Sequence, residues 1–307
     1  MSEHHTPVML KESLDLLIVD RSGKYFDATL GFGGHTSEIL KRINDDGLVV
    51  ASEVDKEAFE YCQNKFNNEL RLNLYNFNYS LIDVIAKIES IEFFDGILAD
   101  LGVSSFQLDE PSAGFTFRSN APLDLRMDKN KKITAADIIN TFTEEDLADI
   151  IYKYGEEKNS RKIARSIINH RLQKKIETTG EMVSLIAELV PEHYLRKTLS
   201  RVFQALRIYV NDELENLKLF LENSVKVLKK GGRLVIITYH SLEDRIVKDF
   251  FKAESIITLS PKEDPLGLIK KDARLKIISR KPITPTENEV KNNYRSRSAK
   301  LRVAERI

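Results

Sequence analysis

The first hundred residues alternate between short apolar runs typical of β-strands and longer stretches with helical periodicity. The strand-like runs are KYFDATL, LVVASEV, RLNLYNFN and FDGILADL, and helical patterns begin between them near His35, Lys56 and Ser80. Strands that alternate with helices in this way form a parallel sheet with helices packed on its faces. The pattern therefore predicts an α/β fold with a parallel sheet covered on both sides.

The alternation stops after Asp100. From about Ser105 to Arg207 the chain is first loop-rich and then has the pattern of successive amphipathic helices, among them TEEDLADIIYKY, SRKIARSIINHRLQKK and TTGEMVSLIAELV. The sheet pattern resumes with the helix DELENLKLFLENSVKVL, the turn KKGG, the strand RLVIITYH and the helix SLEDRIVKDFF, and the strand LKIISRK precedes a polar basic tail. We expect one sheet domain from residues 1–104 and 208–307, with residues 105–207 inserted as a helical domain.

Composition excludes several other classes of protein. No apolar run approaches the roughly 20 residues of a membrane-spanning helix, and the start MSEHHTPVMLKE lacks the pattern of a signal peptide, so we expect a cytoplasmic protein without a membrane partner. The single cysteine, Cys62, excludes an internal disulfide, and its helical surroundings favour simple packing. The histidines at positions 4, 5, 170 and 193 have no metal-ligand spacing, and we expect no metal.

A glycine-rich segment, DATLGFGGH at residues 27–35, follows the first predicted strand and opens the first helix. Glycines allow the backbone to turn sharply and approach a ligand, and a helix N-terminus offers N–H groups to it. Glu53 follows at the end of the second strand, where an acidic residue can bind ribose hydroxyls, with Asp55 as a nearby competitor. These features predict a nucleotide-like cofactor, although the same turn can serve as a tight strand-to-helix connection.

The ends of the next two strands carry further candidates. Asp100 ends the fourth strand, at the sheet edge where ligands of open α/β sheets bind. Tyr79 lies near the end of the third strand, where its ring would lie against an adenine or close the edge of the core. An NAD-dependent oxidoreductase would use a similar glycine turn and acidic residue, so the discrimination from such an enzyme has to come from the fourth strand, which ends in Asp100.

Eight ordered segments make the assignment specific. They are HTPVML at 5–10, DATLGFGGH at 27–35, DGILADLGVSSFQLD at 95–109, GFTFRSNAPLDLRMD at 114–128, YGEEKNSRKIARSI at 154–167, RVFQALRIYVNDELENL at 201–217, GGRLVIITYHSLEDRIVKDFF at 231–251 and RSRSAKLRVAER at 295–306. With these segments the chain resembles, from end to end, the bacterial 16S ribosomal RNA (cytosine-N4)-methyltransferase family.

The resemblance implies a class I methyltransferase-like (Rossmann-like) sheet with a helical substrate-recognition insertion. It implies that S-adenosyl-L-methionine is the cofactor. It also implies that the methyl group is transferred to the exocyclic N4 of a decoding-centre cytidine in 16S ribosomal RNA. The nucleic-acid partner would then be this RNA within the small ribosomal subunit, and not DNA. The family's cofactor contacts correspond to Gly33, Gly34, His35, Glu53, Tyr79, Asp100 and Gln107. Two positions depart from the commoner pattern: Glu53 stands where Asp is usual, and Tyr79 where Phe is frequent. Because glutamate keeps the carboxylate, we expect the ribose contact to survive.

Two residues are candidates for the chemical step. Asp100 would accept a hydrogen bond from the target amine, or else orient the methionine part of the cofactor. His240, after the fifth strand, would face the target base, or else cap the following helix, for which Ser241 and Asp244 have capping-box spacing.

The charge distribution points to an RNA surface. Lys and Arg number 47 and balance 47 Asp and Glu, yet seven basic residues stand against one acidic residue between Glu157 and Lys175, and six against one between Lys291 and Ile307. In the first stretch an apolar stripe is expected from Ile163, Ile167, Ile168 and Leu172, and a basic face from Lys158, Arg161, Lys162, Arg165 and Arg171. Such a face binds phosphates or is simply solvated.

Two further segments are RNA candidates. The candidate residues in the tail are Arg295, Arg297, Lys300 and Arg302. Those in the loop after residue 113 are Phe115, Phe117, Arg118 and Arg126. The loop's aromatic rings would stack on bases or pack into the core.

A non-catalytic ribosome assembly factor with the same fold is the alternative to an enzyme. The sequence leaves open whether the protein is a monomer or a homodimer.

Overall fold

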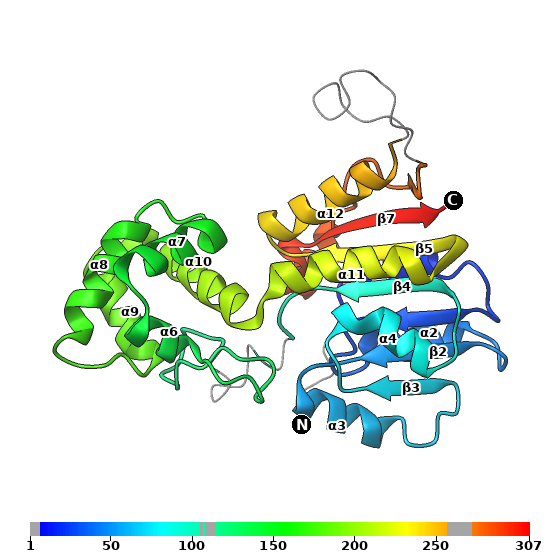
Figure 1. The fold of residues 1–307 in the computed structure, drawn as a ribbon, viewed down its shortest axis with the longest axis horizontal. Coiled ribbons are helices and arrows are strands. Elements are labelled where there is room, and N and C mark those ends of the chain that lie inside the picture. The colour runs from blue at the N-terminus through cyan, green and yellow to red at the C-terminus, as the bar shows by residue number, and fades with distance from the viewer. Residues whose placement is uncertain (1–6, 105–106, 108–113, 257–271) are drawn as a thin grey trace. The chain divides into compact units, whose positions relative to one another are not determined.

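The computed structural model describes residues 7–104, 107, 114–256 and 272–307. The chain divides into two compact units, the first formed by Met1–Gly102 with Leu214–Ile307 and the second by Val103–Glu213 (Figure 1). The first unit contains the sheet, and the second is helical. The sequence-based boundaries, 105 and 207, lie a few residues inside the second unit, because the long helix that ends it continues to Asn211.

The first unit is built on a seven-stranded sheet with the order β3-β2-β1-β4-β5-β7-β6. The strands β1 to β5 pair in parallel, as expected, whereas β7 pairs antiparallel with both β5 and β6. The strands are β1 (Lys24–Asp27), β2 (Leu48–Ser52), β3 (Leu72–Tyr75), β4 (Phe94–Asp100), β5 (Leu228–Thr238), β6 (Leu275–Ile277) and β7 (Lys300–Arg306).

Helices cover both faces of this sheet, because successive side chains of a strand point to opposite faces. Phe26 and Ile97 belong to one apolar cluster, which includes side chains of α4 (Ile82–Ile88), α11 (Glu213–Val227) and α12 (Ser241–Glu254). Their neighbours Tyr25 and Leu98 belong to the other cluster, with side chains of α1 (Leu10–Leu17), α2 (Gly34–Arg42) and α3 (Lys56–Lys65). The predicted three-layer α/β arrangement is therefore confirmed (Figure 1).

The C-terminal segment differs from the prediction of a polar tail. Residues of this segment form α13 (Glu287–Asn292), the 3-10 helix η3 (Tyr294–Ser298) and β7, which lies between β5 and β6. Leu301 and Val303 are fully buried on one face of β7. Arg302 between them and Lys300 before them concealed this alternation, and β6 is shorter than the predicted strand LKIISRK.

The predicted turn KKGG lies within the bounds of β5. Leu228 pairs with Phe94 and Arg233 pairs with Gly96, so the residues between Leu228 and Arg233 form an irregularity opposite a single residue of β4. Gly231 has a φ of 81° there, which favours glycine.

The second unit has its own apolar core, formed by residues of its helices and of the segments between them. Its helices are α6 (Ala135–Thr141), α7 (Glu144–Gly155), α8 (Ser160–Arg171), α9 (Thr179–Ala187) and α10 (Glu192–Asn211). Capping boxes start two of them: Thr134 with Asp137 on α6, and Thr178 with Glu181 on α9. Among the helices of the described residues, none is both long and apolar enough to cross a membrane.

Candidate active site

The glycine turn connects β1 to α2. Gly31 and Gly33 have φ angles of 50° and 74°, a region that L-residues rarely adopt. A Cβ on Gly33 would come within 2.5 Å of the Phe66 ring, and one on Gly34 within 2.4 Å of Pro7 Cγ, so packing requires both glycines. Among the described residues, a Cβ on Gly31 would meet no atom within 4 Å. The turn therefore leaves open space beside Gly31, a residue that the sequence did not single out as a cofactor contact.

Asp27 holds this turn from inside. Its buried carboxylate accepts hydrogen bonds from the Thr36 hydroxyl over 2.6 Å and from the Thr29 N–H over 3.1 Å. Burial raises the pKa of Asp27 above its usual range, and the hydrogen bonds oppose this rise. The sequence gave no role to Asp27, although its position at the end of a parallel strand is the signal that drew attention to Asp100.

Glu53 follows β2 and faces the same turn. Its Oε2 accepts from the Gly31 N–H over 2.8 Å, and its Oε1 accepts from the Asp55 N–H over 2.9 Å. Burial raises the pKa of Glu53 to about 7, against the lowering effect of these backbone donors. Asp55 instead caps α3, accepting from the N–H groups of Glu57 and Ala58. Of the two acidic candidates, Glu53 is thus the one joined to the glycine turn.

Asp100 ends β4, and its side chain is 21% exposed. Oδ1 accepts a hydrogen bond from the Tyr239 hydroxyl over 2.7 Å, and Oδ2 lies 3.8 Å from Nδ1 of the buried His35. Burial raises the pKa of Asp100 to about 7, and the Tyr239 hydrogen bond opposes this rise. Sequence reasoning missed Tyr239, although it directly follows β5, the parallel neighbour of β4.

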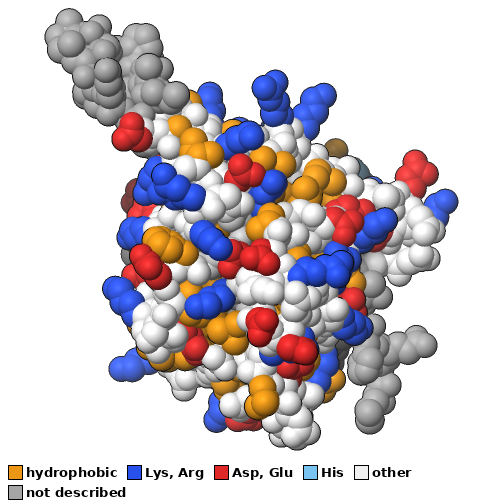
Figure 2. Space-filling view, turned by 90° about the vertical axis from the view of Figure 1, so that its right-hand side faces the viewer, with side chains coloured by type: hydrophobic (Ala, Val, Ile, Leu, Met, Phe, Trp, Pro, Cys, Tyr) orange, Lys and Arg blue, Asp and Glu red, His pale blue; other side chains and the backbone are white. Residues whose placement is uncertain are grey.

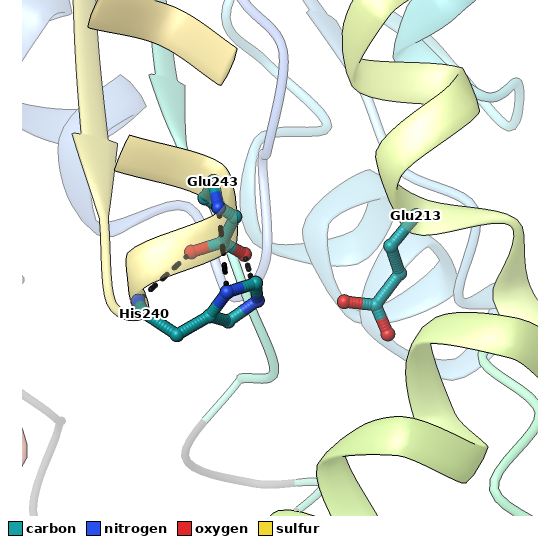
Figure 3. A group of neighbouring side chains, drawn as sticks. All are labelled: Glu213, His240 and Glu243. Carbon is teal, nitrogen blue, oxygen red and sulfur yellow. Dashed lines mark hydrogen bonds and ion pairs between the residues drawn. The ribbon is translucent and has the colours of Figure 1, made fainter. Parts of the chain in front are cut away.

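His240 is the N-cap of α12 (Figure 3). Its Nδ1 accepts from the Glu243 N–H over 3.4 Å, the Glu243 carboxylate accepts from the His240 N–H, and Nε2 lies 3.0 Å from Oε1 of Glu243. The expectation that this histidine caps the helix is confirmed, but the partner is Glu243 and not the Ser241–Asp244 pair. A contact between His240 and a target base stays a prediction. Glu213, also drawn in Figure 3, belongs to the second unit and forms an ion pair with Arg207 there.

The two remaining cofactor candidates have local partners. Tyr79 begins the 3-10 helix η1 (Tyr79–Leu81), and its ring packs edge-on against Phe220 with 5.1 Å between centroids. Gln107 belongs to the second unit, where it exchanges hydrogen bonds with Ser104 over 3.0 and 3.2 Å. Their contacts with a cofactor stay predictions.

The basic tail divides into buried and exposed residues. Arg302 is 7% exposed, and both it and Lys300 form ion pairs with Asp244. The prediction that Arg302 binds RNA phosphates is therefore wrong. Arg297 is exposed and lies over the Tyr294 ring, 5.7 Å from its centroid. Figure 2 shows a face of the molecule on which Lys and Arg side chains are interspersed with Asp and Glu side chains.

The aromatic candidates of the loop after residue 113 belong to the core of the second unit. Phe115 is 7% exposed, and Phe117 packs against Phe203 with 5.4 Å between ring centroids. Arg126 is held by the Asp124 carboxylate, whereas Arg118 is exposed. Base stacking by Phe115 is therefore contradicted, because packing has already covered its ring, whereas Phe117 is only partly buried and its stacking on a base stays a prediction.

Helix α8 carries its basic face as expected. Ile163 and Ile167 are buried in the core and Ile168 packs beside them, but Leu172 is 80% exposed and does not belong to the apolar stripe. The exposed basic side chains on this helix and just before it are Lys158, Arg161, Lys162 and Arg165. Arg171 is half-buried and donates to the Ile139 carbonyl oxygen.

The fold and the site together define an α/β enzyme of the class I methyltransferase type. The sheet is mostly parallel with this strand order, a glycine turn follows β1, an acidic residue follows β2, and a carboxylate ends β4. A sequence model of the MraW methylase family matches residues 2–307. The chain belongs to the MraW methylase family. It is a methyltransferase, and S-adenosyl-L-methionine is its methyl donor.

Relatives cover the whole chain. A protein of Caldicellulosiruptor saccharolyticus named ribosomal RNA small subunit methyltransferase H is 46% identical over 304 residues, which cover 99% of each chain. Proteins with the same name from Halothermothrix orenii and Fusobacterium nucleatum are 47% and 43% identical, and the matches cover 99% and 100% of this chain and 98% of each relative.

Proposed function

We propose that this protein transfers a methyl group from S-adenosyl-L-methionine to the exocyclic N4 of a cytidine in the decoding centre of 16S ribosomal RNA. The observation that carries the proposal is the position of Asp100 at the carboxyl end of β4, where its N–H donates to the Thr29 hydroxyl of the glycine turn and its Oδ2 lies 3.8 Å from Nδ1 of His35. The names of the relatives, which specify small-subunit ribosomal RNA, support the substrate.

The residues around the turn fit the methyl donor. The open side of Gly31 allows close approach to the backbone, and Glu53 offers carboxylate oxygens to ribose hydroxyls at the same edge of the sheet. Gly33 is the N-cap of α2 and makes no side-chain hydrogen bond to this end of the helix. When bound, S-adenosyl-L-methionine supplies an activated sulfonium methyl group.

In the chemical step the protein positions the target amine and accepts a proton from it. The N4 of cytidine is a weak nucleophile because its lone pair is delocalised into the ring, so its orientation toward the methyl group controls the rate. Asp100 would accept a hydrogen bond from the amine and take up a proton during or after transfer. A pKa near 7 suits this role, because the group is partly ionised at neutral pH and can hold the proton.

RNA binding is assigned to exposed basic residues. Lys158, Arg161 and Arg165 of the α8 region are exposed in the second unit, and Arg297 is exposed in the first. Such residues bind phosphates in a salt-dependent way that does not depend on base sequence. The proposal places the protein in the cytoplasm, with the small ribosomal subunit as partner.

Asp100→Asn tests the assignment, because it removes the charge and leaves the shape. We expect single-turnover methylation of purified small subunits to fall by roughly a hundredfold or more, the usual contribution of a positioned acid or base. Asp95→Asn is the matched control: Asp95 lies at the opposite end of β4 and holds Lys24 and Lys229. Undiminished methylation by Asp100→Asn would refute the role of Asp100.

A further inference from the structure

Tyr239 connects the two strands that carry the candidate chemistry. It directly follows β5, and β5 pairs in parallel with β4, so that Asp100 lies opposite Ile237. Its hydroxyl donates to Oδ1 of Asp100 over 2.7 Å. A Cβ built on Gly102 would lie 3.4 Å from the Tyr239 ring, so the ring packs against the chain that leaves β4.

The backbone of Tyr239 is fixed independently of its hydroxyl. Its N–H donates to Oε2 of Glu243 over 2.8 Å, and the same oxygen accepts from the His240 N–H. Glu243 is only 3% exposed and forms the capping box of α12 with His240. The start of α12 therefore fixes the backbone of Tyr239. The hydroxyl at the far end of its side chain in turn fixes the orientation of the Asp100 carboxylate.

The hydrogen bond from the Tyr239 hydroxyl gives the two carboxylate oxygens of Asp100 different surroundings. Oδ1 is occupied by the Tyr239 hydroxyl, and the Asp100 N–H donates to the Thr29 hydroxyl over 2.7 Å, so both the backbone and the side chain of Asp100 are oriented. We propose that Tyr239 is a positioning residue for methyl transfer: its hydroxyl occupies Oδ1 of Asp100 and presents Oδ2 to the target amine. The inference rests on the proposed function, because it assumes that Asp100 meets the amine.

The same hydrogen bond controls the charge of Asp100. Burial raises the pKa of Asp100 to about 7, the Tyr239 hydroxyl lowers it, and nearby carboxylates raise it. The titratable groups that face Asp100 are His35 of α2, Asp27 of β1, Tyr239 after β5, Glu243 of α12 and Glu289 of α13. Loss of the hydroxyl would therefore leave less ionised carboxylate at neutral pH.

Tyr239→Phe removes this hydroxyl and keeps the ring. Single-turnover methylation of small subunits with saturating S-adenosyl-L-methionine would be measured from about pH 6 to about pH 9, the range that spans the pKa of Asp100. We expect the acid limb of the rate profile to move to higher pH by about one unit, which corresponds to a roughly tenfold slower reaction on that limb. The affinity for the RNA should not change.

Tyr25→Phe is the control for a general effect on the sheet. Its buried hydroxyl donates to the Asp20 carbonyl oxygen at the opposite end of β1, so its loss affects stability without touching Asp100. We expect the Tyr25→Phe profile to keep the wild-type midpoint. A Tyr239→Phe profile that also keeps the wild-type midpoint, with or without a uniform loss of rate, would overturn the inference.

A second replacement keeps both ring and hydroxyl. In a protein carrying 3-fluorotyrosine at position 239 the phenol is more acidic and donates a stronger hydrogen bond, so the acid limb should move to lower pH. An unchanged limb would count against Tyr239 even if the phenylalanine variant did not fold. Failure of the wild-type protein to methylate cytidine in small subunits would instead overturn the proposed function.

Discussion

The N–H of Gly31 donates a hydrogen bond over 2.8 Å to Oε2 of Glu53, which ties the glycine turn after β1 to the end of β2. Both residues lie at the carboxyl edge of parallel strands, where ligands of open α/β sheets bind. A ligand that lies against the open side of Gly31 would therefore also be close to the Glu53 carboxylate.

Glu53→Gln tests this relationship. An amide offers a single oxygen acceptor where the carboxylate offers two, so we expect the affinity for S-adenosylhomocysteine to fall by about 10- to 100-fold in calorimetry. Asp55→Asn is the matched control, because asparagine caps a helix as well as aspartate and the variant should bind like the wild type. Equal losses in both variants would show that general acidity, and not Glu53, is responsible.

Gly31→Ala tests the open side of the turn. Gly31 and Gly231 both have positive φ angles, and a Cβ on either meets no atom within 4 Å in the part of the chain that the structure describes. Alanine should therefore cost a similar stability at both positions, on the order of 1 kcal/mol. We expect only Gly31→Ala to weaken S-adenosylhomocysteine binding as well, as measured by calorimetry beside thermal unfolding. Unchanged binding in Gly31→Ala would mean that the cofactor does not approach this face.

The raised pKa values of Glu53 and Asp100 make stability depend on pH. Both groups have folded-state pKa values of about 7, above those of the unfolded chain, so the folded state binds more protons between about pH 4 and about pH 7. Their contribution to the free energy of unfolding is complete below this range and is lost as the pH rises through about 7.

The double variant Glu53→Gln/Asp100→Asn lacks both titrations. Relative to this variant, the wild-type protein without cofactor should lose on the order of 1–3 kcal/mol per group as the pH rises from about 4 to about 8, as measured by urea unfolding. A constant difference between the two proteins over this range would contradict the raised pKa values.

Much of the sheet was predictable because its parallel strands are short apolar runs that alternate with helical patterns along the chain. Tyr25 and Leu98 belong to one apolar cluster and Phe26 and Ile97 to the other, so these parallel strands are buried on both faces and appear in the sequence as short apolar runs between helical patterns. The strand β7 was missed because its buried Arg302 looks like a surface residue. Only the ion pair with Asp244, more than fifty residues away in the chain, allows that arginine to be buried.

The site was predictable where position along a strand decides it. Glu53 and Asp100 follow from the rule for strand ends, and Asp27 and Tyr239 would have followed from the same rule had it been applied to every strand. Other outcomes depend on tertiary packing. The burial of Phe115 is decided by neighbours that spacing alone does not reveal, whereas the pairing of His240 with Glu243 has the local spacing of a capping box.

Two arginines of the C-terminal segment, Arg297 and Arg302, should behave differently. Arg302→Ala leaves Asp244 with its exposed partner Lys300 but without its buried one, so we expect a loss of about 3 kcal/mol or more in the free energy of unfolding. Arg297→Glu changes an exposed residue, so we expect nearly wild-type stability and weaker, less salt-dependent binding to small subunits. Equal RNA affinity in Arg297→Glu and the wild type would remove Arg297 from the RNA surface.

The central claim, that the protein methylates N4 of a 16S ribosomal RNA cytidine, is tested most directly by mass spectrometry of that RNA. Small subunits from cells lacking the gene would be treated with S-adenosyl-L-methionine and either the wild-type protein or Asp100→Asn. We expect N4-methylation at a single decoding-centre cytidine with the wild type and little or none with the variant. Methylation at another base, at another atom of cytidine, or to the same extent with both proteins would contradict the account.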